Sequence, residues 1–138
     1  MPENAIKDVA GYTETAASGG ILLTIAAAVL MGPIAEEIAF RGFMTTRLKM
    51  RFPVWFAVAL STLAFSAGHY TGGIGQLIGT AWTGLLFCLV FLWTKSLRAS
   101  IFAHILNNAV GFLMPEAVFA EMGLPVKLVL LVVGLAVT

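Results

Sequence analysis

The sequence predicts an all-α protein, a polytopic transmembrane helical bundle with four to five spans. Of its 138 residues 59% are hydrophobic and only 11% are charged, whereas an ordinary soluble domain has about 25% charged residues. The apolar residues also occur in blocks of about membrane-spanning length. No internal repeat or linker separates a second domain, so we expect a polar N-terminal segment over 1–17 and one domain over 18–138.

The first two spans follow from apolar runs and from proline. Residues 18–32 are small and apolar, and we expect helix to continue through a kink at Pro33 to about Met50. A second span should cover 53–68, because Pro53 suits the start of a helix, where its missing N–H has no intrahelical partner.

The remaining spans are separated by glycine, proline and short polar connections. The glycines within 71–75 predict a turn, and 76–94 is long enough for a third span. A fourth helix should cover 97–114 and end before Pro115. The apolar run 124–137 begins a fifth span within which the sequence ends, so either this segment is short or the chain is truncated at its C-terminus.

Charge and cysteine content exclude several functions. A net charge of +1 without a basic stripe argues against nucleic-acid binding. Cys88 is the single cysteine and lies in an apolar run, so we interpret it as a packing residue.

The basic residues predict the orientation in the membrane. Lys and Arg concentrate in cytoplasmic connections, and six of the eight lie between spans one and two or between spans three and four. They are Arg41, Arg47, Lys49, Arg51, Lys95 and Arg98. We therefore expect the side of the membrane with these two connections to be cytoplasmic. We also expect the site formed by the polar residues within the membrane to open toward that side.

Two adjacent glutamates lie in the first helical segment. An ionisable group in the hydrocarbon is costly without a partner, so it is a functional hypothesis by default. Glu36 and Glu37 point about 100° apart on a helix and must have separate roles. Arg41 lies four residues after Glu37, a spacing that allows an ion pair. This pairing leaves Glu36 as the candidate general base; the alternative is that all three residues mark the membrane border.

His69 and His104 are the two histidines of the chain, and each lies in or at the end of an apolar helix. Asn108 lies one turn after His104 on the same face, and Phe65 has the same relation to His69. Polar residues also join transmembrane helices, which is an alternative for each of them and for Asn107 and Gln76. Two histidines, two glutamates and an asparagine on three helices nevertheless favour a catalytic site.

These residues form three motifs in order: Glu36-Glu37-x-x-x-Arg41, Phe65-x-x-x-His69 and His104-x-x-x-Asn108. The set resembles the signature motifs of the CPBP family of intramembrane proteases, also called the Abi domain. This family contains CAAX proteases, among them the type 2 CAAX prenyl endopeptidases, and bacteriocin-processing enzymes. The resemblance covers about 22–108.

The resemblance implies an intramembrane endopeptidase of a bacterial or archaeal plasma membrane. Its substrate would be a prenylated or other membrane-associated protein or peptide, cut near the surface of the lipid bilayer. Carried onto this chain, the family pattern has Glu36 and His69 activate water and His104 and Asn108 stabilise the oxyanion, while Glu37 and Arg41 support the site. Members of the family usually have additional helices, so this chain resembles a catalytic core.

Whether the water is activated with a metal is left open by the sequence. Glu36, His69 and His104 form a possible zinc ligand set with an open position for water. Direct activation by Glu36 needs no cofactor, and we favour it because two donors one turn apart on a helix suit an oxyanion better than a tetrahedral ion. No HExxH zinc motif and no GxSG serine motif is present.

Two other functions remain compatible with this sequence. One is a catalytically inactive relative that acts in bacteriocin immunity or binds a partner. The other is a small transporter in which glutamate and histidine relay protons, although the inverted repeats that would favour it are not visible.

Overall fold

The computed structural model describes residues 20–113, and these residues form helices and connections without any strand. The all-α prediction is therefore confirmed for this part of the chain. The predicted polar segment 1–17 and the predicted fifth span 124–137 lie outside the described residues, so the domain boundaries stay predictions.

The first helical segment continues from residue 21 to residue 49, as expected. Its consecutive parts are α2 (Ile21–Ile25), η1 (Ala26–Met31), α3 (Gly32–Glu37), η2 (Ile38–Thr45) and α4 (Thr46–Lys49). The parts η1 and η2 are π-helical, and Pro33 lies in the first turn of α3, directly after η1. A proline cannot donate an intrahelical hydrogen bond, and a wider π turn is a known way for a helix to continue past such an interruption.

Three further helices complete the described fold. They are α5 (Val54–Ala67), α6 (Gly73–Thr94) and α7 (Leu97–Leu113), with a short 3-10 turn, η3 (Tyr70–Gly72), before α6. Pro53 immediately precedes α5, as predicted. Helix α6 begins three residues earlier than the predicted 76, because Gly73 takes the positive φ of 83° that ends η3 and starts the helix.

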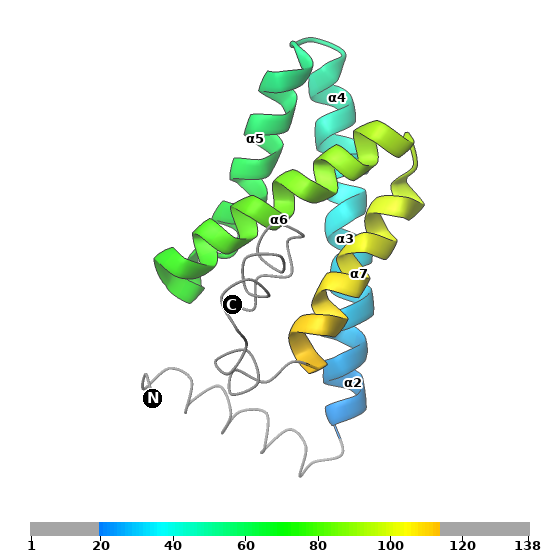
Figure 1. The fold of residues 1–138 in the computed structure, drawn as a ribbon, viewed down its shortest axis with the longest axis vertical. Coiled ribbons are helices and arrows are strands. Elements are labelled where there is room, and N and C mark those ends of the chain that lie inside the picture. The colour runs from blue at the N-terminus through cyan, green and yellow to red at the C-terminus, as the bar shows by residue number, and fades with distance from the viewer. Residues whose placement is uncertain (1–19, 114–138) are drawn as a thin grey trace, which may run out of the picture.

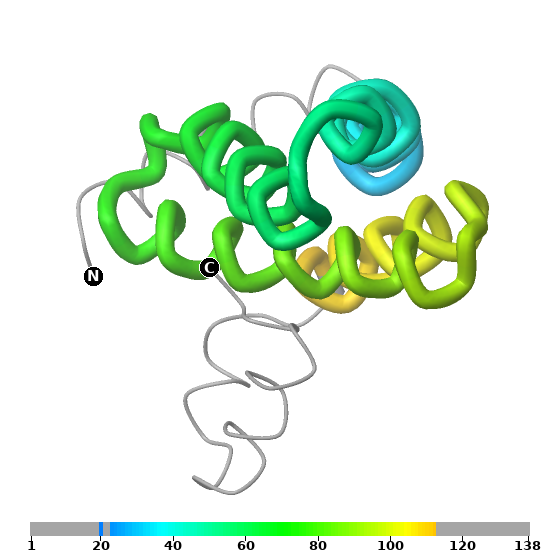
Figure 2. The backbone as a smooth tube through the Cα atoms, turned by 90° about the horizontal axis from the view of Figure 1, so that it is seen from above, coloured from blue at the N-terminus to red at the C-terminus, as the bar shows by residue number. Residues whose placement is uncertain are grey.

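The helices lie in two rows (Figures 1 and 2). The first segment and α5 form one row, and α6 crosses them obliquely before the chain returns as α7. Contacts join α5 to α6, α6 to α7, and α7 to both α3 and η1. Helices α5 and α6 also contact η2, so α5, α6 and α7 all approach the first segment near its middle.

Burial is inverted relative to a soluble protein. Within residues 20–113 the buried side chains include Glu37, Arg41, Ser61, Ser100 and His104. Large apolar residues face outward instead, for example Leu23, Leu63, Ile78, Trp93 and Phe102, each at least 64% exposed. A polar interior with an apolar exterior is the pattern of a helix bundle surrounded by lipid.

Two helices of the described part are long and apolar enough to cross a membrane, over Leu23–Lys49 and Tyr70–Thr94. Helix α5 is apolar but has only 14 residues. The predicted total of four to five spans therefore stays a prediction.

The connections that carry basic residues lie toward one end of the molecule. Figure 1 shows the α4–α5 and α6–α7 connections at its upper end. They contain Arg51 and Lys95, and the nearby helix ends carry Arg47, Lys49 and Arg98. Arg41, which the sequence analysis counted with this group, is instead completely buried. Cys88 is also completely buried, as expected for a packing residue.

Candidate active site

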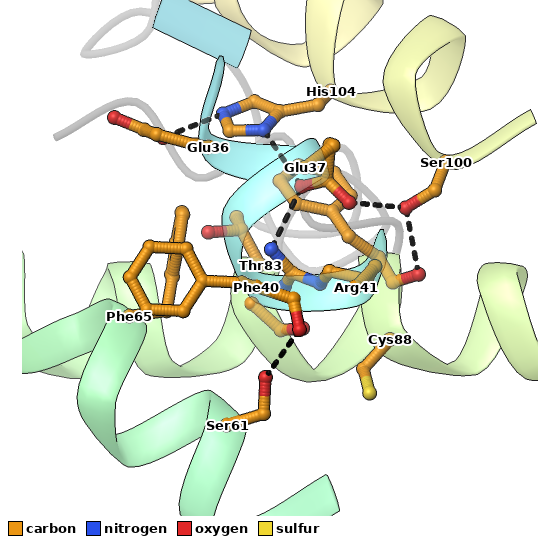
Figure 3. A network of polar contacts seen from close by, with 12 residues as sticks. Glu36, Glu37, Phe40, Arg41, Ser61, Phe65, Thr83, Cys88, Ser100 and His104 are labelled. Carbon is orange, nitrogen blue, oxygen red and sulfur yellow. Dashed lines mark hydrogen bonds and ion pairs between the residues drawn. The ribbon is translucent and has the colours of Figure 1, made fainter. Parts of the chain in front are cut away.

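Glu37 is a completely buried carboxylate at the point where α3, α6 and α7 meet (Figure 3). Its Oε1 accepts a hydrogen bond from Arg41 Nη1 at 2.7 Å and lies 3.0 Å from Nδ1 of His104. Its Oε2 accepts a hydrogen bond from the hydroxyl of Ser100. The predicted ion pair between Glu37 and Arg41 is thus confirmed, and Glu37 is held by donors on both oxygens.

Arg41 has partners on three sides. Besides the Glu37 carboxylate, its Nη2 donates to the carbonyl oxygen of Gly84 on α6. Its guanidinium carbon lies 4.8 Å from the ring centroid of Phe65 and 5.6 Å from that of Phe87. Because a cation over an aromatic face is attracted by the ring, these contacts add to the ion pair.

The π-helical segment η2 positions this pair. Glu37, Arg41 and Thr45 are spaced by four residues and are all completely buried, so they share the inner face. The hydroxyl of Thr45 lies 2.8 Å from the carbonyl of Phe40, and that of Thr46 lies 2.9 Å from the carbonyl of Arg41, each five residues back. Such π turns occur often at functional sites, and here the turn begins directly after the glutamate pair.

His104, on α7, is oriented by a carboxylate and an aromatic ring. Phe87 stacks on its imidazole with centroids 4.4 Å apart and planes at 21°. An ionised carboxylate only accepts hydrogen bonds, so Nδ1 of His104 carries the proton in this contact whenever Glu37 is ionised. A neutral His104 then has its lone pair on Nε2. As a consequence, His104 can donate from Nε2 only when both of its nitrogens are protonated.

Glu36 is the accessible member of the glutamate pair. Its Oε2 lies 3.7 Å from Nε2 of His104, and its side chain is 34% exposed, whereas that of Glu37 is completely buried. This distance is too long for a direct hydrogen bond. The carboxylate of Glu36 and the imidazole of His104 therefore face each other at a partly exposed place, and the two glutamates differ in burial and in partners.

His69 lies directly after α5 and is one aromatic ring away from this group. Its Nδ1 lies 3.0 Å from the carbonyl oxygen of Phe65. The ring of Phe65 packs against His69 with centroids 5.0 Å apart and against His104 with centroids 5.7 Å apart. The structure thus places Glu36 and Glu37 next to His104, and His69 against the ring of Phe65, which also contacts His104.

Asn108 joins α7 to the first helical segment. Its Nδ2 donates to the carbonyl of Ala28 on η1 at 3.1 Å, and its Oδ1 accepts from the amide of Asn107 at 3.3 Å. An amide group carries two N–H groups, of which the contact with Ala28 uses one. Asn108 therefore lies one turn beyond His104, as the motif predicts, and its role toward a substrate stays a prediction.

The proposed zinc set does not fit this arrangement. Within residues 20–113, no group of three or more His, Cys, Asp or Glu side chains could hold a metal ion. Zinc needs three protein ligands at about 2.0–2.2 Å in a catalytic site. Of the three candidates, the described contacts bring only Glu36 and His104 together.

Ser100 is the site residue that the sequence analysis missed. It is completely buried, and its hydroxyl contacts both the Glu37 carboxylate and, at 3.0 Å, the carbonyl oxygen of Phe87. Its signal in the sequence is position alone: it precedes His104 by four residues, just as Asn108 follows it by four, so one face of α7 carries all three.

Comparison with known proteins identifies a family and a relative to which the chain is similar. The family described as "Type II CAAX prenyl endopeptidase Rce1-like" matches residues 18–110. Among curated proteins, the chain is 29% identical over 92 residues to "Putative membrane peptidase YdiL" of Bacillus subtilis (strain 168). The match covers 67% of this chain and 37% of that relative, so the chain spans little more than a third of the relative's length. No solved structure matches the chain significantly.

Proposed function

Because this chain belongs to the type II CAAX prenyl endopeptidase family of the Rce1-like kind, we propose that it is an intramembrane endopeptidase acting on prenylated or other membrane-associated proteins or peptides. The observation that supports this most directly is the pair formed by the accessible Glu36 and the oriented His104, 3.7 Å apart. Glu37 and Arg41 hold the pair from the buried side.

The proposed reaction begins with a water molecule next to Glu36. The carboxylate takes a proton from the water, and the oxygen attacks the carbonyl carbon of the scissile bond. Glu36 later gives this proton to the leaving amine nitrogen as the carbon–nitrogen bond breaks. The family resemblance also assigns His69 to water activation; in this chain His69 packs against the ring of Phe65, which also contacts His104.

The oxyanion formed in this attack needs donors. In the proposal, doubly protonated His104 donates from Nε2, and Asn108 supplies an amide N–H one turn further along α7. The imidazolium is placed between the carboxylates of Glu36 and Glu37, which balance its charge. A protonated His104 and an ionised Glu37 therefore form one functional unit.

The test is cleavage of a farnesylated CAAX peptide by the purified chain in detergent, with release of the C-terminal tripeptide measured by mass spectrometry. Glu36→Gln keeps the size of the side chain but removes the base, so we expect kcat to fall by roughly 10²–10⁴-fold. Circular dichroism and thermal unfolding should be unchanged, because the Glu36 side chain is 34% exposed. Full activity of Glu36→Gln would refute the mechanism, and a folded but inactive wild-type chain would favour the partner-binding relative.

A chelator added to the same assay tests the metal-free version. We expect cleavage to persist after prolonged treatment with a strong zinc chelator, since the base and the donors come from the protein. Stoichiometric zinc in the active protein, lost together with activity and restored with it, would overturn this version and leave the endopeptidase proposal standing.

A further inference from the structure

We infer that Ser100, which lies outside all three motifs, is a positioning residue of the site: it fixes the carboxylate of Glu37 so that Glu37 holds His104 with Nε2 toward Glu36. This inference rests on the proposed function for its catalytic meaning. It is carried by the contacts of one completely buried hydroxyl on α7.

The two oxygens of Glu37 have different tasks. Oε1 accepts a hydrogen bond from Arg41 and also lies 3.0 Å from Nδ1 of His104, which donates to it when Nδ1 carries the proton. Oε2 is contacted by Ser100 from one turn before His104 on the same helix. With Ser100 in place, rotation of the carboxylate about its terminal torsion is opposed at both oxygens. Without it, only Oε1 is held, and a terminal carboxylate torsion is otherwise broad.

Ser100 also contacts Phe87, the second residue that supports His104. The same hydroxyl lies 3.0 Å from the carbonyl oxygen of Phe87, whose ring stacks on the imidazole. One hydroxyl has one proton and can donate to one acceptor at a time. It donates to Glu37 when that carboxylate is ionised. If Glu37 takes up a proton, Glu37 can donate to Ser100 while Ser100 donates to Phe87. The hydroxyl therefore has an acceptor for its proton in both protonation states of Glu37.

Because Ser100 acts through Glu37, removal of the Ser100 hydroxyl should slow the chemical step more than it weakens substrate binding. Removal of a group that supports an oriented histidine from behind typically lowers activity by about 10- to 100-fold. We therefore expect Ser100→Ala to lower kcat for the farnesylated peptide by about 10- to 100-fold and to leave KM within about twofold. Ser100→Thr, which keeps the hydroxyl, should recover most of the loss.

Ser61 provides the matched control. It is also a completely buried helical serine, but its hydroxyl contacts Thr45 and the carbonyl of Phe40 and not Glu37. Ser61→Ala should lose a buried hydrogen bond of the same kind and keep the kcat of the folded protein. Equal effects of the two alanine variants on unfolding, with unchanged kcat for both, would show that Ser100 is merely structural and would overturn the inference.

A second measurement does not depend on peptidase activity. The chain has only two histidines, so His69→Gln leaves His104 as its single imidazole, and ¹⁵N chemical shifts then report which nitrogen is protonated. We expect Nδ1 of His104 to be protonated in this background, with or without a second proton on Nε2, and forms that lack the Nδ1 proton to appear after Ser100→Ala. Unchanged shifts would overturn the inference. Inactive wild-type protein with the expected shifts would refute the proposed function alone.

Discussion

At the scale of single residues, the site separates two adjacent glutamates by burial. Glu37 is completely buried and both of its oxygens accept hydrogen bonds from protein donors, whereas Glu36 is partly exposed and faces His104. A carboxylate surrounded by three donors cannot also serve as a mobile base. The neighbour that lacks such donors is the one suited to proton transfer.

Arg41→Ala should destabilise the protein as well as inactivate it. The substitution leaves the Glu37 carboxylate without its ion-pair partner in a place with no exposure, and breaking a buried pair in this way costs about 3–5 kcal/mol. We expect a lower midpoint of thermal unfolding in detergent and less monodisperse protein. Arg47→Ala is the control, because Arg47 is exposed and contacts only the ring of Phe43 among the described interactions. An Arg41→Ala protein of wild-type stability would contradict this and place Arg41 among the catalytic groups.

The sequence predicted the charged contacts better than the neutral ones. A spacing of four residues between Glu37 and Arg41 implies an ion pair, because two opposite charges on one apolar helix need each other. Ser100 carries no such requirement, since a helical serine can bond to its own backbone. The contacts between Phe65 and the two histidines depend on how α5 and α7 pack, which no local spacing specifies.

At the scale of elements, the close crossing of α5 and α6 depends on Gly84. A Cβ atom at this position would lie 2.8 Å from Cδ1 of Phe65. The Phe65 ring also touches both histidines and the Arg41 guanidinium. Gly84 thus lets α6 approach closely enough for its carbonyl to accept from Arg41.

Gly84→Ala should therefore displace Phe65 and reduce both stability and activity. Overpacking of this kind costs typically about 1–3 kcal/mol, and we expect a lower unfolding midpoint together with a lower kcat. Gly75→Ala is the matched control on the same helix, because a Cβ there meets nothing within 4 Å and alanine favours helix. Equal behaviour of the two variants would show that Phe65 adapts without effect on the site.

Helix positions followed from the sequence to within a few residues, but helix type did not. Apolar runs bounded by Pro53 and by the glycines after His69 fix where α5 lies. The π-helical segment η1 lies just before Pro33, whereas η2 contains no proline that would mark it in the sequence. Their effect on the register of Glu37 and Arg41 had to come from the structure.

At the scale of the whole molecule, buried polar residues such as Glu37, Arg41 and His104 are enclosed by helices that expose many large apolar residues. The helices are unequal: α6 has 22 residues and α5 has 14. At 1.5 Å per residue α5 is about 21 Å long, shorter than the hydrocarbon core of about 30 Å. His69 follows directly at the end of this short helix.

Activity should consequently depend on the lipid. In vesicles of short-chain phosphatidylcholine the end of α5 lies closer to the headgroups than in vesicles of long-chain phosphatidylcholine. We expect faster cleavage of the farnesylated peptide in the thinner bilayers, at equal amounts of folded protein. A rate independent of chain length, with the peptide equally partitioned, would contradict this.

The length of α5 has a consequence for the bilayer itself. A short apolar helix is matched by local thinning of the surrounding lipid or by inward movement of headgroups. Such local thinning of the bilayer beside His69 would let water penetrate toward Glu36 from the end of α5, without a permanent channel through the protein. In the proposed reaction, the hydrolytic water would then be supplied by a deformation that protein and lipid share, and the thickness of the host membrane would be one of the factors that set the turnover.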